Sequence, residues 1–484
     1  MSKDNATTPD VRLGYVGLSA LVFAMMVGAG IFNIPQNMAV SAGPTATVIA
    51  WAVTAAGMLT LVMTFRILSQ RQPELNAGMY LYARQGFGMF TGFLSAWGYW
   101  LCTAFSNVAY AVMLNDTVGA VFPSLLRHGW PTVVFGSALI WIIFFVVSAG
   151  MRTAKVLNTA LSAVKFGSIA LIVILLGAHF SFDTFRESLA ASAGASGVGT
   201  QPGLGAQVKD TMMVTLWCFI GIEGAVMMSA RARRSRDVGR AGTTGFFTAW
   251  ILYVLVSVLC FGVMTRARLA GLDDPSVAYV LRECCGPWAY WLVIVSVVLS
   301  LGGGWVAWSL VCAEVPYMAS RSGLLPREFR RLNRHGIPTA GLLASSVIMQ
   351  LFLLLVVWAE HVYLTALNIT GMMILPSYLL SGLYLWKSSR GRHRAGVLTG
   401  AVCTLFCAWM IYAGGIGLFF ETSIFYVLGL GVWFRTLRQH DARSRLSLPP
   451  GVRSLVPLTR GEVAGIGALL LTAAITLCLR LAEQ

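Results

Sequence analysis

Charged residues are scarce in this chain of 484 residues: Asp, Glu, Lys and Arg make up 11% of it, and hydrophobic residues 57%. A soluble domain carries roughly 25% charged residues. Apolar stretches long enough to cross a bilayer recur from end to end. The composition excludes a soluble enzyme and predicts an all-α polytopic membrane protein. The polar start, "MSKDNATTPD", has no apolar core of its own, so the first span, not a cleaved signal peptide, is expected to direct insertion.

Ionisable side chains are rarer still inside the predicted spans. No Asp lies deep in a span, and all six His fall at span ends or in loops. The charges expected within the membrane are Glu223, Lys165 and, toward the end of a span, Glu314. An intramembrane hydrolase or metalloenzyme needs a base, a nucleophile or a metal shell in one place. We therefore expect neither an intramembrane hydrolase nor an intramembrane metalloenzyme.

The nine cysteines lack the spacing of a metal site. Most lie in apolar spans, where small soft side chains pack. Cys284 and Cys285 are adjacent and unsuited to an ordinary structural disulfide. We therefore expect no metal and no cofactor.

The net charge of +16 has a topological explanation. The basic residues gather in short loops such as "RARRSRDVGR", "RSGLLPREFRRLNRH" and "KSSRGRHRAG", which all fall on one side of the membrane. Short basic loops are orientation signals that stay in the cytoplasm. The pattern predicts a cytoplasmic N-terminus and argues against a nucleic-acid partner.

Hydropathy predicts twelve or thirteen transmembrane helices. Three glycines, Gly414, Gly415 and Gly417, blur one of the last boundaries, and a thirteenth span would place the C-terminus outside. The expected spans are 13–40, 45–67, 88–114, 132–150, 156–178, 210–230, 243–264, 287–318, 339–358, 362–386, 396–415, 420–436 and 461–481.

Two of these spans look interrupted. The first contains "MMVGAGIFNIP", residues 25–35, and the sixth contains "FIGIEGA". Paired glycines let the backbone leave helical geometry. Close helix packing through small residues is the alternative explanation of either motif. Because the first and sixth spans are equivalent if five spans repeat, we favour broken helices, which mark the central site of many transporters.

Broken helices expose backbone groups that could bind a zwitterion. Free amides at Gly28, Ala29 and Gly30 would attract a carboxylate, since the N-terminal end of a half-helix is positive. In the sixth span, the free carbonyls would accept hydrogen bonds from an α-ammonium group. The carbonyls expected to do so belong to Trp217, Cys218 and Ile220. This pattern predicts an amino acid as the ligand.

Each charged or aromatic candidate has a structural alternative. Glu223 is either the partner of a cationic side chain or a neutral acid bonded to another helix; function is favoured, since acids are costly in hydrocarbon. Trp217 and Trp305 are cation–π platforms or interfacial tryptophans. Lys165 is functional or snorkels to the interface. Glu314 pairs with Lys165 or with the Arg-rich loop after it, and an interfacial salt bridge is slightly favoured.

The order and spacing of several motifs resemble a known superfamily. The chain, over roughly residues 10–440, is similar to the amino acid–polyamine–organocation superfamily, specifically its basic amino acid/polyamine antiporters, and most similar to bacterial arginine–ornithine antiporters. The motifs are "GIFNIPQNMA", "GMYLYARQGFG", "SAWGYW", "FIGIEGA", "SARARRSRDVGRA", "GPWAYW" and "SLVCAE".

The resemblance implies a fold and a domain division. After a tail at 1–12, a ten-helix core at 13–386 would contain two inverted five-helix repeats, about 13–178 and 210–386, with discontinuous helices 1 and 6. Additional helices would occupy 387–484. Alternating access and a homodimer are further implications of the family.

The resemblance also implies residue roles. Gly28, Ala29 and Gly30 would bind the substrate carboxylate, Trp217 would stack on a guanidinium group, and Trp305 would be a second aromatic contact. Glu223 and Tyr99 would form the gate, with Asn107 nearby and Tyr80 implicated in the response to pH. Lys165 would replace the sodium ion of sodium-coupled relatives and hold the first helix.

Several positions depart from the arginine–agmatine relatives. Ala29 replaces a serine, and Met25 replaces a polar residue one turn earlier. Ser377, followed by Tyr378, stands at the gate tyrosine, and Ile369 replaces a serine contact. These departures fit the arginine–ornithine type better.

The resemblance, together with the residues, implies a sodium-independent exchanger of arginine and ornithine in the bacterial inner membrane. Both carry one net positive charge at pH 7, so the exchange would be electroneutral. The alternatives are a lysine or polyamine antiporter for cadaverine, agmatine or putrescine, and a proton-coupled symporter of basic amino acids. A non-transporting sensor is a remote alternative, because no sizeable soluble output domain is expected.

Overall fold

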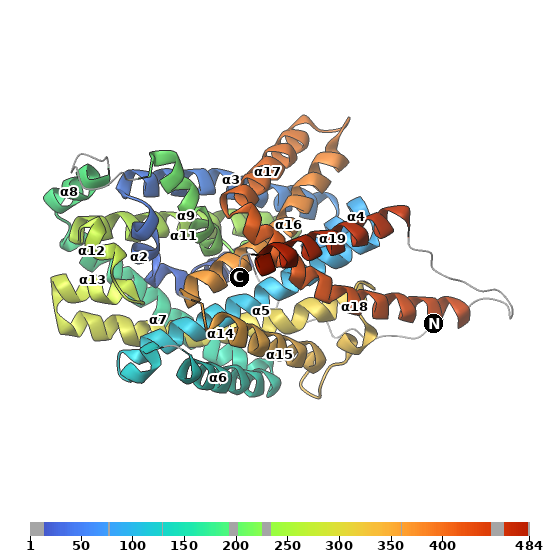
Figure 1. The fold of residues 1–484 in the computed structure, drawn as a ribbon, viewed down its shortest axis with the longest axis horizontal. Helices are drawn as coiled ribbons and strands as arrows, with labels where there is room; N and C mark the ends of the chain where they lie inside the picture. Colours follow the sequence, from blue (N-terminus) through green and yellow to red (C-terminus); the bar gives the residue numbers. More distant parts are fainter. Residues whose placement is uncertain are drawn as a thin grey trace.

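The computed structural model describes residues 14–75, 78–127, 129–192, 202–224, 234–359, 361–446 and 459–482. Within these ranges every regular element is helical, and the long helices run side by side along the molecule (Figure 1). The expected all-α membrane architecture is confirmed.

The first half of the chain begins with a divided helix and ends with a short helix at one end of the molecule (Figure 1). Its elements are α1 (Tyr15–Met26), η1 (Ala29–Phe32), α2 (Ile34–Ser41), α3 (Pro44–Arg71), α4 (Met79–Phe87), α5 (Met89–Gly119), η2 (Pro123–Arg127), α6 (Trp130–Ser148), α7 (Met151–Ala178) and α8 (Phe182–Ser192).

The second half again begins with a helix that stops early. Its elements are α9 (Leu204–Cys218), α11 (Ser235–Val263), α12 (Arg266–Ala270), α13 (Ser276–Cys285), α14 (Pro287–Arg321), η4 (Arg327–Arg330), α15 (Thr339–Val356), α16 (Val362–Ser389), α17 (Arg394–Ala413), α18 (Ile416–Leu446) and α19 (Arg460–Ala482).

Nine helices among the described residues are long and apolar enough to cross a membrane, including the last, α19. A tenth span is possible in the pair formed by α7 and α8, which is bent by 88°. The remaining expected spans correspond to the divided helix α1–α2, to α9 and to α5. Helix α5 is buried along nearly its whole length, so its polar residues face other helices and not lipid.

Both expected interruptions are present. Helix α1 ends at Met26 and α9 ends at Cys218, and turns follow each end. Gly221 has φ +111°, a conformation that favours glycine. A Cβ on Gly221 would lie 2.8 Å from the carbonyl carbon and oxygen of Met25, so the two breaks pack directly against each other. The end of the expected sixth span, 225–230, and the first part of the basic loop after it, 231–233, lie outside the described residues.

An ion pair connects η4 to the C-terminal helix α18. Arg435 and Gln439 both donate to the carboxylate of Glu328. Burial acts to raise the pKa of Glu328, but these hydrogen bonds outweigh it and lower the pKa to about 2. The side chains of Arg435 and Glu328 are 65% and 40% exposed, so the pair is worth less than about 1 kcal/mol.

Replacing Glu328 with glutamine is therefore expected to lower thermal stability slightly at neutral pH. Because the pKa in the folded protein lies below its ordinary value of 4.5, the stabilisation is complete above that pH and disappears as the pH falls toward 2. Melting curves of both proteins in detergent should converge in acid. A difference that persists at low pH would contradict the assignment.

Candidate functional site

A buried carboxylate lies where the two helix breaks meet. Glu223 is 1% exposed. Its Oε1 accepts a hydrogen bond from Tyr99 Oη of α5 at 3.1 Å, and its Oε2 accepts from Tyr378 Oη of α16 at 2.7 Å. The backbone N–H of Gly221 donates to Oε2 at 3.0 Å. All three partners are donors, and they connect the α9 break to two long helices.

The end of α1 is held by side chains from two other helices. Lys165 Nζ of α7, 3% exposed, donates to Ala24 O at 3.1 Å and to Val27 O at 2.6 Å. Tyr253 Oη of α11 lies 2.8 Å from Met26 O and 2.9 Å from Cys218 O, so it can donate to either. A helix end leaves carbonyls without intrahelical partners. Lys165 satisfies Ala24 O, and Tyr253 can satisfy Met26 O.

The glycines after α1 allow aromatic rings to approach the backbone. A Cβ on Gly28 would lie 2.3 Å from Tyr110 Oη, and a Cβ on Gly30 would lie 2.6 Å from Trp217 Cζ3. The N–H of Gly28 donates to Met26 O at 2.9 Å, so it is not a free donor in this conformation. The break is therefore covered by Tyr110 and Trp217.

Two carbonyls of the sixth helix that were expected to be free have hydrogen-bond partners in the structure. Trp217 O accepts from the N–H of Ile220 at 3.1 Å, and Cys218 O lies within hydrogen-bond distance of Tyr253 Oη. Neither carbonyl is free, because the chain tightens into turns after the break. Each keeps a second lone pair that can accept another donor.

Buried polar atoms without partners lie on the helices that pack around the breaks. Trp305 is 1% exposed, and its Nε1 has no hydrogen-bond partner in the described chain. Asn107 is fully buried; its Nδ2 donates to Thr103 O and Cys312 Sγ, whereas its Oδ1 is unpartnered. Unsatisfied buried groups are costly and call for an explanation such as a bound ligand or water.

Tyr80 and Glu314 lie on α4 and α14, and Tyr80 is near enough to Tyr99 to interact with it electrostatically. Tyr80, on α4, is fully buried, and its Oη has no partner within the described residues. Glu314, on α14, is near enough to interact with Tyr80 electrostatically.

Two further candidate residues make hydrogen bonds to other helices. The two hydrogen bonds of Lys165 go to carbonyls of the first helix. Ser377, at the gate tyrosine position, bonds to Ser95, and the neighbouring Tyr378 contacts Glu223.

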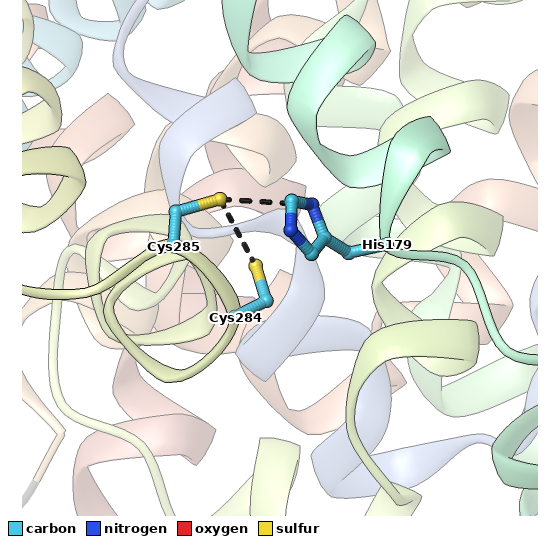
Figure 2. A group of neighbouring side chains, drawn as sticks. All are labelled: His179, Cys284 and Cys285. Carbon is cyan, nitrogen blue, oxygen red and sulfur yellow. Dashed lines mark hydrogen bonds between the residues drawn. The ribbon is translucent and has the colours of Figure 1, made fainter.

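One group of side chains could hold a metal ion, although the cysteine spacing did not predict it. Cys285 Sγ lies 3.6 Å from Cys284 Sγ and 3.7 Å from His179 Nδ1, where α13 ends beside the end of α7 (Figure 2). His179 Nδ1 also lies 2.9 Å from Leu175 O, a contact that competes with metal binding. These three residues lie at the ends of α7 and α13, whereas the helix breaks follow α1 and α9.

Sequence reasoning missed the tyrosines that complete the site. Tyr253 and Tyr363 lie in apolar runs where nothing in the pattern identifies their partners. The ring of Tyr363 packs edge-on against Trp217, with centroids 5.8 Å apart. Tyr110 could have been suspected, because it lies one helical turn after Asn107 on the same helix.

Replacing Tyr253 with phenylalanine tests the junction between the two breaks. Met26 O keeps the N–H of Gly28 as a donor, but loss of the hydroxyl removes the side-chain donor from the buried carbonyl of Cys218, at a cost of about 1–3 kcal/mol. We expect a lower melting temperature, whereas the same change at Tyr412, which is 49% exposed, should have little effect. Equal melting temperatures for the Tyr253 variant and the wild type would contradict this arrangement.

Broken helices packed break-to-break in a polytopic bundle define a membrane transporter, since non-helical backbone at membrane depth is tolerated where it lines a site. The family model for amino acid permeases matches residues 13–434. The chain belongs to the amino acid permease family.

Named relatives agree with this assignment, and a solved structure has a similar fold. An arginine/agmatine antiporter of Chlamydia felis is 38% identical over 440 residues, covering 88% of this chain and 90% of that protein. An arginine/agmatine antiporter of Chlamydia pneumoniae is 37% identical, covering 88% and 90%. The fold is similar to a Na⁺-coupled sialic acid symporter in a substrate-bound outward-open state, with TM-score 0.51, 12% identity and coverage of 86% and 92%.

Proposed function

We propose that the protein exchanges basic amino acids across the bacterial inner membrane, with arginine and ornithine as the first candidate pair. The observation that carries the proposal is Glu223, a buried carboxylate at the junction of the two helix breaks. The family assignment and the names of the relatives support an antiporter of this substrate class.

In the proposed site, the substrate bridges the two breaks. Amides of Ala29 and Gly30 bind the α-carboxylate, and the amide of Gly28 joins them when it releases Met26 O. The second lone pairs of Trp217 O and Cys218 O, together with Ile220 O, accept hydrogen bonds from the α-ammonium group. The cationic side chain lies between Trp217 and Trp305, with Asn107 Oδ1 as an acceptor.

Glu223 responds to the substrate charge. Tyr99 and Tyr378 donate to its carboxylate. A guanidinium or ammonium group that approaches Glu223 makes a stronger charge-assisted bond than a neutral hydroxyl does. The substrate then draws α9 away from α5 or α16, and this differential contact is what couples binding to alternating access.

Sodium independence is supported by Lys165. Its ammonium group contacts two carbonyls at the end of α1, so a fixed positive charge already holds this helix end. A sodium ion at the same place would be repelled. Tyr80 and Glu314 remain predictions as gating or charge-coupling residues.

Arginine/agmatine exchange is the second candidate, since it is the named activity of the Chlamydia relatives. The substitutions at Ala29, Met25, Ser377 and Ile369 favour ornithine over agmatine. The two pairs differ physically: arginine and ornithine carry equal charge, whereas agmatine has no carboxylate and carries one more positive charge than arginine.

Liposomes loaded with ornithine, agmatine, lysine, cadaverine or putrescine distinguish these candidates. We expect uptake of labelled arginine to be fastest with internal ornithine and unaffected by an imposed membrane potential. Exchange that moves one charge is biased by about 2.3 kcal/mol per 100 mV. Potential-dependent uptake driven by agmatine would replace the ornithine assignment.

The proposed topology places the N-terminus in the cytoplasm, with the three basic loops on the same side. The ten-helix core is 13–386, with repeats at about 13–178 and 210–386, and 387–484 supplies additional helices. A homodimer is proposed from the resemblance. Cysteine labelling of intact cells tests the orientation.

A further inference from the structure

A polar cavity of about 240 Å³ opens beyond the helix breaks. Helix α2, the end of α5, the loop before α13 and the start of α16 surround it. Helices α2, α12 and α13 gather at one end of the molecule (Figure 1). The chain order of the helices places this end opposite the three basic loops. The side chains that matter are Asn37, Asp116, Asp273, Asp274, His361 and Tyr363.

The cavity is acidic in a basic protein. Asp116, Asp273 and Asp274 line it, and none of the described lining residues is a lysine or arginine, although the chain carries a net charge of +16. Asp116 is 8% exposed and accepts a hydrogen bond from Asn115 Nδ2 at 3.0 Å. Burial, followed by repulsion from Asp116 and Asp273, raises the pKa of Asp274 well above its usual range. A cation between these groups would relieve that repulsion.

Unpartnered polar atoms on the cavity wall also indicate a ligand. Asn37 and Tyr363 are each 4% exposed, and neither Asn37 Oδ1 nor Tyr363 Oη has a hydrogen-bond partner within the described chain. Asp274 Oδ1 is buried and likewise unpartnered. Oxygen atoms that lack a donor, beside carboxylates, suit a ligand with many N–H groups and a positive charge.

The cavity is separated from the helix breaks by one layer of aromatic rings. Tyr363 lines the cavity and packs against Trp217, whose ring lies against Gly30. A ligand in the cavity therefore has only to pass the Trp217–Tyr363 pair to reach the proposed central site. The cavity is close to the lower limit of small-molecule sites, about 300 Å³, so it suits a single amino acid.

We propose that this acidic cavity is an outer subsite that binds the guanidinium or ammonium group of a basic amino acid before it enters the central site. The inference rests on the proposed function and adds a second binding position to it. Asp273 and Asp274 accept the side-chain cation, and Asn37 Oδ1 accepts from a further N–H group. The subsite concentrates cationic substrates on the face opposite the basic loops.

The kinetics of exchange test the subsite. In oriented proteoliposomes, the Asp273→Asn/Asp274→Asn double variant should have a KM roughly tenfold higher than the wild type for arginine offered on the cavity side. A cleft lined by charges of one sign raises the local concentration of an oppositely charged substrate by at least that factor. The maximal rate and the KM on the opposite side should not change. Asp183→Asn, an exposed acid on α8, is the matched control and should leave KM within about twofold of wild type.

The outcomes separate this inference from the proposed function. Unchanged KM in the double variant, or a lower maximal rate with the same KM, overturns the subsite while wild-type exchange still supports the function. If the wild type does not exchange basic amino acids, the proposed function fails. Equilibrium dialysis of labelled arginine against the purified wild type and the purified double variant then shows whether the cavity binds arginine. Loss of binding in the double variant supports the subsite, and equal binding overturns it.

Discussion

Replacing Glu223 with glutamine is expected to reduce arginine exchange by about 100-fold. The change keeps the size of the side chain but removes the charge that the substrate cation meets. Removing one partner of a buried, hydrogen-bonded charge pair costs about 2–5 kcal/mol, and about 2.7 kcal/mol corresponds to 100-fold. Initial rates in ornithine-loaded liposomes measure the effect.

A matched control is Glu187→Gln, which removes an exposed acid from α8. It should exchange at the wild-type rate. The melting temperature of Glu223→Gln shows whether a loss reflects misfolding. The amide oxygen of the glutamine can accept from Tyr378 and Gly221, which share one carboxylate oxygen in the wild type, and its NH2 group can donate to Tyr99 Oη. A folded Glu223→Gln protein with wild-type exchange would remove Glu223 from the mechanism.

Replacing Lys165 with methionine is expected to have the second-largest effect, a loss of exchange of at least about 30-fold. The variant keeps the apolar stem but leaves Ala24 O and Val27 O without their donor, at about 1–3 kcal/mol for each buried carbonyl. The end of α1 is then no longer fixed beside the glycines of the substrate site. Arginine binding and exchange by the purified variant measure this.

Lys209→Met is the control for Lys165→Met, because Lys209 stacks on Tyr412 away from the breaks. It should retain exchange. Sodium provides a readout that a purely structural lysine would not change: if Lys165 occupies the place of a cation, millimolar sodium should partly restore exchange in Lys165→Met and not affect the wild type. Full exchange by Lys165→Met without sodium would contradict the proposed role.

The fold was largely predictable because membrane helices are long apolar runs and their interruptions are rich in glycine. The breaks after Met26 and Cys218 were predicted because glycine, a poor helix former, stands inside apolar runs that would otherwise be helical. Short helices such as α12 and α13 were not predicted. They are too brief for a hydropathy signal, and they form because they pack on α2, α11 and α14.

The charged residues of the site were also predictable, whereas their partners were not. A lone Glu223 or Lys165 in an apolar span is rare enough to be noticed. Tyr253 and Tyr378 are ordinary residues in apolar helices, and only the tertiary fold brings them to Met26 and Glu223. The acidic cavity was missed for the same reason, since its aspartates come from two segments separated by about 155 residues in sequence.

The central claim, obligate exchange of basic amino acids, is tested most directly by double-label counterflow. Liposomes containing the purified protein are loaded with ¹⁴C-ornithine and diluted into ³H-arginine, with all sodium and proton gradients abolished. The account predicts one ornithine released for each arginine taken up, and negligible uptake into empty liposomes. Arginine uptake into empty liposomes driven by a proton gradient would contradict the exchanger and make the protein a symporter.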